Sequence, residues 1–416
     1  MRLWSLVRHR TDRAPSSQLP YLGLDQLESG TGRLAEGSEL QPQDDPQALL
    51  CQPGDVLFGK LRPYLHKVHN VDDVLVCSGE LMVLRPNSQV SGRYLYYVAL
   101  SDLFVGWATA TSYGVKMPRT NWDALRELRV SLPSLDEQRR VADYLDSETG
   151  RIDALIAAKR RLREVVSERA TALVDAAISR GLDAVADLNE TGITGVGPIP
   201  THWAIAPLAR LVDPYRPIRY GIVLPGPNVD DGVPIIKSGD VRPGRLAPGL
   251  LDRTTHEIES GYIKSRVFPG DIVYSIRGSV GDAEIVPGEL HMANLTQDAA
   301  RIAPRDGLDP RWLLHALRSR RLFAQLESGM TGAAVKGVNI GALRKLRVPL
   351  PPLEEQHAIA VFLDRETAVM GQITSAASRQ IDLLNEFRQA LITSTVTGEI
   401  PLPPEWAGDE WKKVAS

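Results

Sequence analysis

Residues 125–155 read LRELRVSLPSLDEQRRVADYLDSETGRIDAL, and residues 343–373 read LRKLRVPLPPLEEQHAIAVFLDRETAVMGQI. The second stretch repeats the first at an offset of 218 residues, about half of this 416-residue chain. Solenoid proteins repeat every 20 to 50 residues or so, whereas a period of this length indicates a duplicated unit of domain size. The sequence therefore predicts two similar modules on one chain.

Both copies contain a signature for the start of a helix, LPSLDEQ in the first and LPPLEEQ in the second. The proline suits the first helical turn, and the two acids favour the positive end of the helix dipole. Apolar residues then recur at a spacing of about 3.5 to 3.6 residues up to Gly181 and Gly398, two glycines suited to helix caps. The pattern predicts long helices at residues 135–182 and 353–397.

A helix of this length rises by roughly 65 Å at about 1.5 Å per residue, which is more than one small module can cover. The apolar stripe of each helix therefore needs a long partner, and we expect that partner to be the other helix. Because each helix follows its own module, an antiparallel pair would hold the modules apart and relate them by a pseudo-two-fold axis. The alternative is that each helix packs independently on its own module.

The segments before the two helices share a weaker pattern. GDVLFGKLRPYL at residues 54–65 corresponds to GDIVYSIRGSVG at residues 270–281, and both predict an extended strand after a Gly-Asp turn. Helix-like stretches follow in both modules. The predicted fold class is α+β, with two domains of small twisted sheets and helices separated by two long antiparallel helices in a coiled coil. The expected segments are a first domain (1–134), helix (135–182), linker (183–200), second domain (201–352), helix (353–397) and tail (398–416).

The composition is that of an ordinary soluble globular protein, with 43% hydrophobic and 24% charged residues. The N-terminal residues carry charge throughout, and no run of about 18 apolar residues occurs, so neither export nor a membrane span is expected. We expect a cytoplasmic protein in which Cys51 and Cys77 are reduced and buried. Because phosphate contacts normally leave a basic imprint, the net charge of −3 implies that any nucleic-acid surface is a local groove.

One motif suggests nucleotide chemistry, since Gly54 to Lys60 fits the glycine and lysine spacing of a phosphate-binding loop. Such a loop needs a serine or threonine next, whose hydroxyl binds Mg²⁺, and this chain has Leu61. The second module does not repeat the pattern. No methyltransferase, metalloprotease or serine-hydrolase motif occurs, and no metal-ligand spacing. We predict no catalytic residue, no metal site and no cofactor bound by this chain.

Cationic and amide side chains recur on loops of both modules. The loops TSYGVKMPRTNWDAL and MTGAAVKGVNIGAL each contain Val-Lys followed by an asparagine. Arginine suits the edge of guanine, lysine suits bases or phosphates, and small residues allow close approach to a phosphate. The alternative is that these lysines are solvated surface residues in turns. The predicted DNA-binding residues are Lys60, Arg62, Lys116 and Asn121 in the first module and Lys237, Arg277, Lys336 and Asn339 in the second.

On these motifs the chain resembles the DNA-specificity (S) subunits of Type I restriction-modification systems. The resemblance rests on the two Gly-Asp strands, the lysine-to-asparagine loops, the paired LPSLDEQ and LPPLEEQ, and the long helices, and it covers nearly the whole chain. It implies two target recognition domains, each reading one half of a bipartite site in double-stranded DNA. The conserved helices would hold these domains apart, and the subunit would have no catalytic centre.

The resemblance also implies partners. Two modification subunits would transfer methyl groups from S-adenosylmethionine to adenine, and restriction subunits would use ATP and Mg²⁺ for translocation and cleavage. The residues around Gln138 and Gln356 are expected to bind the modification subunits. A competing interpretation is a two-module protein adaptor on a helical rod that does not bind DNA, and a third is an enzyme that uses a nucleoside triphosphate.

Overall fold

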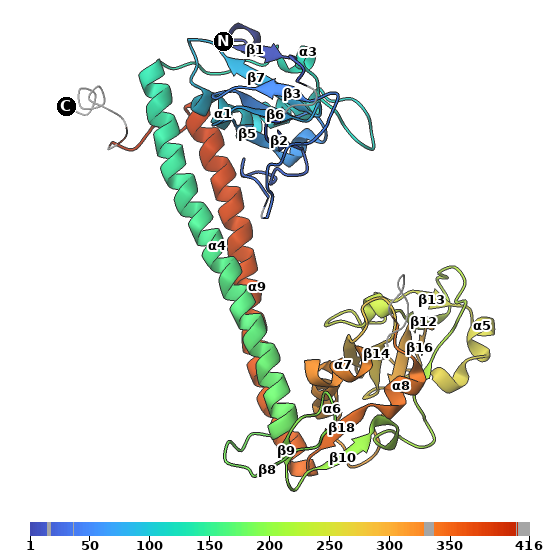
Figure 1. Ribbon diagram of the computed structural model, residues 1–416. Coiled ribbons are helices and arrows are strands. Elements are labelled where there is room, and N and C mark those ends of the chain that lie inside the picture. Colours follow the sequence, from blue (N-terminus) through green and yellow to red (C-terminus); the bar gives the residue numbers. More distant parts are fainter. Residues whose placement is uncertain (15–17, 36, 328–336, 405, 407–416) are drawn as a thin grey trace. The chain divides into compact units, whose positions relative to one another are not determined.

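The computed structural model describes residues 1–14, 18–35, 37–327, 337–404 and 406. By its internal contacts the chain forms two compact units. Unit 1 joins Met1–Arg161 to Ala377–Ser416, and unit 2 is the continuous segment Leu162–Ala376. The boundary between them passes through both long helices, α4 (Leu135–Arg180) and α9 (Leu353–Thr397), which are drawn in green and red in Figure 1. The six segments expected from the sequence are a different division, and they stay a prediction.

The domain of unit 1 contains a four-stranded antiparallel sheet and a three-stranded mixed sheet. The first has the order β1 (Val7–Arg10), β7 (Leu81–Pro86), β4 (Val56–Gly59) and β5 (Val68–Asn70). The second has the order β2 (Tyr21–Leu22), β6 (Leu75–Cys77) and β3 (Leu49–Cys51). Its α-helices before α4 are α1 (Gly92–Leu100), α2 (Asp102–Ala110) and α3 (Trp122–Leu125).

The strand β4 explains why the glycine spacing from Gly54 to Lys60 is not a phosphate-binding loop. All four of its residues are buried, and the ring of Phe58 packs edge-on against Phe104 of α2 with the centroids 4.9 Å apart. Apolar Val-Leu-Phe therefore supplies a core strand, where a phosphate loop would need flexible backbone open to a ligand. Cys51 and Cys77 are free and buried, which confirms the expectation for both thiols.

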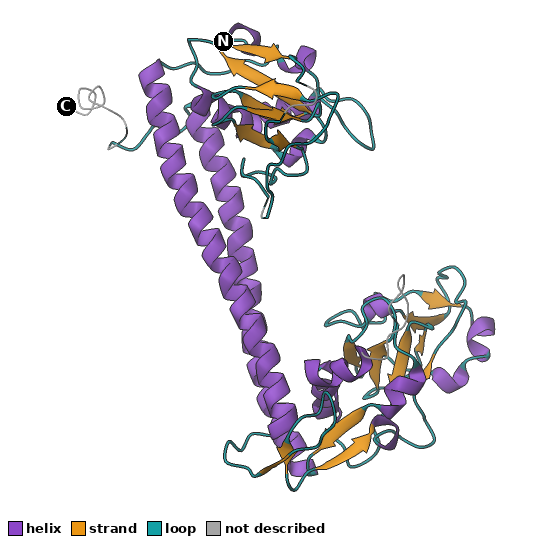
Figure 2. Cartoon of the chain, viewed as in Figure 1, coloured by secondary structure: helices purple, strands orange, loops and turns teal. Residues whose placement is uncertain are grey.

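Unit 2 repeats the four-stranded sheet of unit 1 but not the order of its three-stranded sheet, and Figure 2 shows the strands and helices of both units. Its four-stranded sheet has the order β11 (Arg219–Tyr220), β17 (Ala299–Ile302), β14 (Ile272–Ser275) and β15 (Ala283–Ile285). Its three-stranded sheet has the order β13 (Arg253–Thr254), β12 (Val233–Ile236) and β16 (Asn294–Leu295). Two further pairs are β8 (Leu188–Asn189) with β9 (Ile199–Pro200), and β10 (Ala204–Pro207) with β18 (Arg347–Leu350).

The α-helices of unit 2 before α9 are α5 (His256–Ser260), α6 (Pro310–Arg318), α7 (Arg320–Glu327) and α8 (Ile340–Lys345). The helices α6, α7 and α8 follow the sheets of unit 2 as α1, α2 and α3 do in unit 1, whereas α5 lies before β14 and has no counterpart among the described residues there. Short 3-10 helices in the two units are η1 (Leu3–Ser5), η2 (Pro63–Leu65), η3 (Leu208–Arg210), η4 (Ser238–Asp240) and η5 (Ile263–Ser265).

The long helices pack on each other inside each unit. In unit 1 the first half of α4 and the second half of α9 share a hydrophobic core that contains Ile152 and Ile392. In unit 2 the second half of α4 and the first half of α9 share another, which contains Ile178 and Leu363. This pairing of opposite halves confirms the antiparallel arrangement, and the alternative of two independent helices is wrong. Each core also includes the neighbouring domain.

One strand was not apparent from the sequence, which shows no obvious strand at its start. β1 has the sequence VRHR, in which only Val7 is apolar and buried. It lies at the edge of its sheet, and among the described strands it pairs with β7 alone. An edge strand with one covered face needs few apolar residues, so its hydrophobic pattern is weak.

Candidate nucleic-acid interface

The repeated glutamine of LPSLDEQ fastens α4 to its domain. The Gln138 side chain is fully buried. Its Oε1 accepts a hydrogen bond from the Ser91 backbone N–H at 2.8 Å, and its Nε2 donates to the Pro133 carbonyl at 3.0 Å. Ser91 is the residue before α1, so one amide joins the start of α1 to the start of α4.

The second copy makes the same junction. Oε1 of Gln356 accepts from the Asp309 N–H at 3.0 Å, and its Nε2 donates to the Pro351 carbonyl at 2.9 Å. All three residues stand 218 positions after their counterparts in unit 1. The duplicated motif therefore preserves a particular set of hydrogen bonds between domain and helix.

A polar contact further along each helix strengthens the junction. The Tyr97 hydroxyl donates to the carboxylate of Asp146 in unit 1, and His315 Nε2 lies 2.7 Å from the Asp364 carboxylate in unit 2. Burial raises the pKa of the Tyr97 hydroxyl and lowers the pKa of the His315 ring. The Asp146 carboxylate raises the pKa of Tyr97 as well, whereas the Asp364 carboxylate opposes burial at His315 without reversing the shift. Both groups are therefore mainly neutral at pH 7.

Unit 2 presents three adjoining hollows beside its main sheet. The middle one, of about 610 Å³, is lined by Tyr220, Arg277, Gln297 and Asn339 among others. It shares Gln297 with a second hollow of about 580 Å³ and Tyr220 with a third of about 770 Å³. The cationic residues that line the two outer hollows are Lys237, Arg242, Arg245, Arg219, Lys264 and Arg344. We refer to the three hollows as the basic groove.

The basic groove contains three of the residues predicted from the sequence of the second module. Arg277 is about half exposed, and its guanidinium lies 3.9 Å from the Asp298 carboxylate, a distance too long to hold it firmly. Lys237 forms an ion pair with Asp252. Asn339 caps α8 by accepting from the Gly341 N–H at 2.7 Å. The fourth predicted residue, Lys336, lies outside the described residues.

The four predicted residues of the first module lie on two adjoining loops. The Arg62 N–H donates to the Pro118 carbonyl, and the Thr120 N–H donates to the Lys60 carbonyl. Lys60 Nζ donates to the Gly79 carbonyl at 2.6 Å, and burial lowers the pKa of this half-buried amine. Arg62 has a left-handed backbone with a φ of 50° and is partly buried. Lys116 is exposed, and Asn121 caps α3 by accepting from the Ala124 N–H at 2.9 Å. Within this set Lys116 is the side chain most open to a ligand.

Known proteins match both units. A family model described as the Type I restriction modification DNA specificity domain matches residues 52–162 and 227–381, more than half of the chain. The chain belongs to this family. It is the non-catalytic specificity subunit of a Type I restriction-modification system, in which catalysis resides in partner subunits.

Relatives of this specificity subunit extend over most of its length. The Type I restriction enzyme EcoBI specificity subunit of Escherichia coli is 26% identical over 88% of this chain and 77% of that protein. The putative MjaX specificity subunit of Methanocaldococcus jannaschii is 24% identical over 83% and 78%, respectively.

Solved structures share the fold of this specificity subunit. A chain from a study of complex assembly and conformational transition of the Type I R-M system aligns with a TM-score of 0.73, at 24% identity over 96% of this chain and 97% of that one. The HsdS subunit of Thermoanaerobacter tengcongensis aligns with a TM-score of 0.53, at 22% identity over 96% of both chains.

Hydrogen bonds of the two specificity modules agree with the alignment of residues 54–65 with residues 270–281. The Thr120 N–H donates to the Lys60 carbonyl, and the Val338 N–H donates to the Ile276 carbonyl. Lys60 therefore matches Ile276, and the next residue, Leu61, matches Arg277. The two modules do not present cations at the same positions of this loop, because the loop side chains diverged while the backbone pairing stayed.

The two glutamines cannot themselves face a partner of the specificity subunit in this structure, because both side chains are buried in their own units. A partner surface at the helix starts would have to use exposed neighbours such as Asp136 and Glu354. One sequence does not reveal whether a repeated amide is buried or exposed. Tyr220 and Gln297 were missed for a related reason, since neither lies in a repeated motif.

Among the residues that the structure describes, no group of histidine, cysteine or carboxylate side chains is arranged to hold a metal ion. Within the same residues, no helix has the length and apolar character needed to cross a bilayer.

Proposed function

We propose that this specificity subunit binds a bipartite site in double-stranded DNA, with one recognition domain for each half-site. The observation that carries the proposal is the basic groove of unit 2, where a half-exposed Arg277 and Gln297 are flanked by cations. An arginine fork matches the O6 and N7 acceptors of guanine, and a glutamine amide matches adenine. The recognition domains would be residues 1–134 and 201–352.

The roles of the other predicted residues follow from their surroundings. Lys237 already has a carboxylate partner, so we assign it to the DNA backbone or to positioning rather than to a base. Lys116 is the strongest candidate for contact in the first domain, with Arg62 and Lys60 beside the same loop region. Asn121 and Asn339 would act through the helices that they cap, and Lys336 remains a proposed contact.

Recruitment of two modification subunits is the second part of the proposal. Each long helix exposes apolar residues at positions that the repeat relates. Leu155 of α4 corresponds to Ile373 of α9, and these side chains are 51% and 39% exposed. Val165 corresponds to Leu383, at 43% and 62%. Exposed apolar side chains that recur in both helices suit two copies of one partner.

The chemistry would then belong to the partners. The modification subunits would bind S-adenosylmethionine, and restriction subunits would use ATP and Mg²⁺, while this chain would bind none of these. A complex that acts on cellular DNA would work in the cytoplasm. The specificity chain would recognise the DNA sequence and set the spacing between the half-sites.

The test is to co-express the chain with the modification subunit of the same system and map methylated adenines across the host genome. The expected result is a bipartite motif that disappears when the chain is omitted. A control strain would carry the modification subunit alone. Methylation that does not depend on the chain would contradict DNA recognition and favour the protein adaptor.

A further inference from the structure

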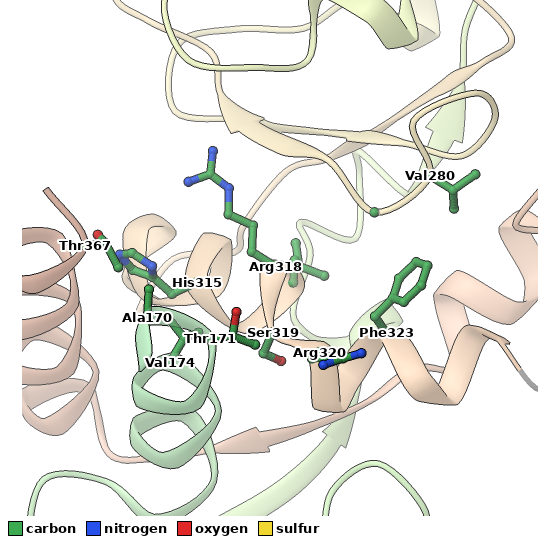
Figure 3. Close-up of a pocket in the computed structure, with 12 residues that line it drawn as sticks. Ala170, Thr171, Val174, Val280, His315, Arg318, Ser319, Arg320, Phe323 and Thr367 are labelled. Atoms are coloured by element: carbon green, nitrogen blue, oxygen red, sulfur yellow. The ribbon is translucent and has the colours of Figure 1, made fainter. Parts of the chain in front are cut away.

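A hollow of about 480 Å³ in unit 2 shares no lining residue with the basic groove. It is bordered by α4, α6, α7, α9 and the turn between β14 and β15. Figure 3 shows Ala170 and Thr171 of α4 on one side and Phe323 of α7 on another. The function proposed above makes no use of this space.

The internal repeat identifies the counterpart of this hollow in unit 1. Subtracting 218 from Thr367 gives Thr149, and adding 218 to Ala170 and Thr171 gives Arg388 and Gln389. The correspondence is structural as well, since Thr149 and Thr367 both bond to the carbonyl four residues earlier in their helix. In unit 1 the two small side chains of the hollow are therefore replaced by two long ones.

Those long side chains fill the site in unit 1 and tie a loop to the helix pair. The Arg388 guanidinium donates to the carbonyl of Gly30 at 2.7 Å and to that of Thr31 at 3.1 Å, and it lies 3.2 Å from the Asp153 carboxylate. Arg388 is only 4% exposed. A segment of polypeptide thus occupies the junction of domain and helices.

Gln389 closes the rest of the site in unit 1. Its Nε2 donates to the Leu100 carbonyl at 2.7 Å and to the Asp102 carboxylate at 3.1 Å. The repeat places Arg320 at the position of Asp102, so the charge of the domain wall is reversed between the units. Unit 2 therefore lacks the hydrogen-bond donors that Arg388 and Gln389 supply in unit 1. In the domain, the cation Arg320 replaces the acid Asp102.

The chemistry of the hollow follows from these replacements. Arg320 is exposed at its edge, and no ion pair involving it occurs among the described residues. Val174 and Phe323 give the remaining wall an apolar character. The hollow therefore suits a ligand that brings an acidic group to Arg320 and apolar atoms to the interior.

We propose that this hollow receives a loop of the modification subunit that carries a carboxylate, in the place that the loop containing Gly30 and Thr31 fills in unit 1. The inference rests on the proposed function, because it assumes that a modification subunit binds beside unit 2. A polypeptide occupant is favoured because a polypeptide fills the equivalent site in unit 1. The two modification subunits would then bind in different ways, and only one would insert a loop.

The test transplants the side chains of unit 1 into unit 2. The double substitution Ala170→Arg with Thr171→Gln fills the hollow, and Ala172→Arg, at an exposed position of the same helix, is the matched control. Binding of the purified modification subunit to the full chain is followed by native mass spectrometry and titration. We expect one of the two binding events to weaken by about tenfold or more in the double variant and to be unchanged in the control.

A charge reversal provides an independent measurement. Arg320→Glu should weaken the same binding event, because it would repel the carboxylate of the inserted loop. Two unchanged binding events in both variants would overturn the inference and leave the proposed function standing. Failure of the unaltered chain to bind the modification subunit would overturn both.

A small anion is the alternative occupant. The melting temperature of the isolated chain is measured with inorganic phosphate at millimolar concentration, with and without the double substitution. We expect no shift in either protein. A rise that the double substitution abolishes would assign the hollow to a small anion and overturn the protein loop.

Discussion

Each of the two units contains a buried aspartate, and the arginine that pairs with it comes from a different place in each unit. Asp55 is the aspartate of the Gly-Asp turn in unit 1 and Asp271 is that of unit 2, and both are at most 2% exposed. Arg85 of β7 neutralises Asp55 through two hydrogen bonds of 2.7 Å, whereas Arg216, from the loop before β11, neutralises Asp271. A buried carboxylate needs a partner charge, but the fold does not dictate which strand or loop supplies it.

The junctions of domain and helix show the opposite behaviour. Gln138 and Gln356 accept from a backbone N–H and donate to a prolyl carbonyl at equivalent positions, and Gln138 donates to the Gln89 carbonyl as well. The buried ion pair can be formed by arginines from different elements, but the glutamine junction is formed in the same way in both units. A charge can be compensated from several directions, whereas an amide that must bond to two backbone groups at once tolerates only one geometry.

The largest effect is expected from removing the buried carboxylates. Asp55→Ala and Asp271→Ala should each lower the free energy of unfolding of their own unit by about 3 kcal/mol. This is the lower end of the range for buried pairs, because about a third of each arginine side chain is exposed. Hydrogen exchange of β4 and β14 reports the two units separately.

The control for this pair is Asp72→Ala, at an exposed position. If the free energy of unfolding fell in only one unit, the two ion pairs would not be equivalent. One arginine would then compensate its carboxylate and the other would not.

A smaller effect, about 2 kcal/mol, is expected for Gln138→Ala and for Gln356→Ala, because each leaves a partly or fully buried backbone N–H without its acceptor. The measurement is urea unfolding of the two variants, with the exposed Gln372→Ala as control. Unequal losses would show that the two junctions are equivalent in geometry but not in energy.

Arg277→Ala tests whether the two recognition domains read different half-sites with different side chains. We expect recognition of one half-site to relax, at a cost of about 2 kcal/mol in binding, while the other half-site stays fully specified. Methylation mapping with the co-expressed modification subunit reads both halves in one experiment. Arg305→Ala, an exposed arginine outside the groove, serves as control. Equal weakening on all sequences would instead make Arg277 a phosphate contact.

The helix caps are expected to contribute about 1 kcal/mol each, so Asn121→Ala and Asn339→Ala should reduce stability equally. The variants Asn121→Asp and Asn339→Asp keep the capping oxygen and add a negative charge. If the asparagines act only as caps, these two variants retain both stability and DNA affinity. Preserved stability with lost affinity would place the asparagine beside a phosphate.

The smallest effect on stability is expected from mild acidification. In unit 2 the hydrogen bonds from Arg266 hold the pKa of the buried Glu259 below its usual value of 4.5. Because the folded pKa is depressed, this contribution is complete above about pH 4.5 and is lost as the pH falls through the folded pKa. Unfolding experiments from pH 6 to pH 3 should show a weaker acid dependence for Glu259→Gln. An identical pH profile would contradict this assignment.

The helix pair could be predicted from the sequence because an apolar stripe of that length has only one adequate partner on the chain. The bond from Lys60 to the Gly79 carbonyl could not be predicted, since tertiary contacts and not residue type decide whether a loop lysine faces a ligand. The strand β1 escaped prediction because a single buried valine leaves no alternation to detect. The hollow beside Ala170 had no positive signal at all, and it becomes visible only when Arg388 is seen to fill its counterpart.

The division of the chain into a continuous unit 2 and a split unit 1 has a consequence for synthesis. Unit 1 cannot close its core until Ile381 and Ile392 have emerged, yet Arg161 is separated from Ala377 by the whole of unit 2. At about 5–20 residues per second the ribosome needs roughly 10–45 s for that interval. During this time unit 2 can fold first while Ile152 and Ile156 stay uncovered. The half of the protein that is translated first therefore becomes native last.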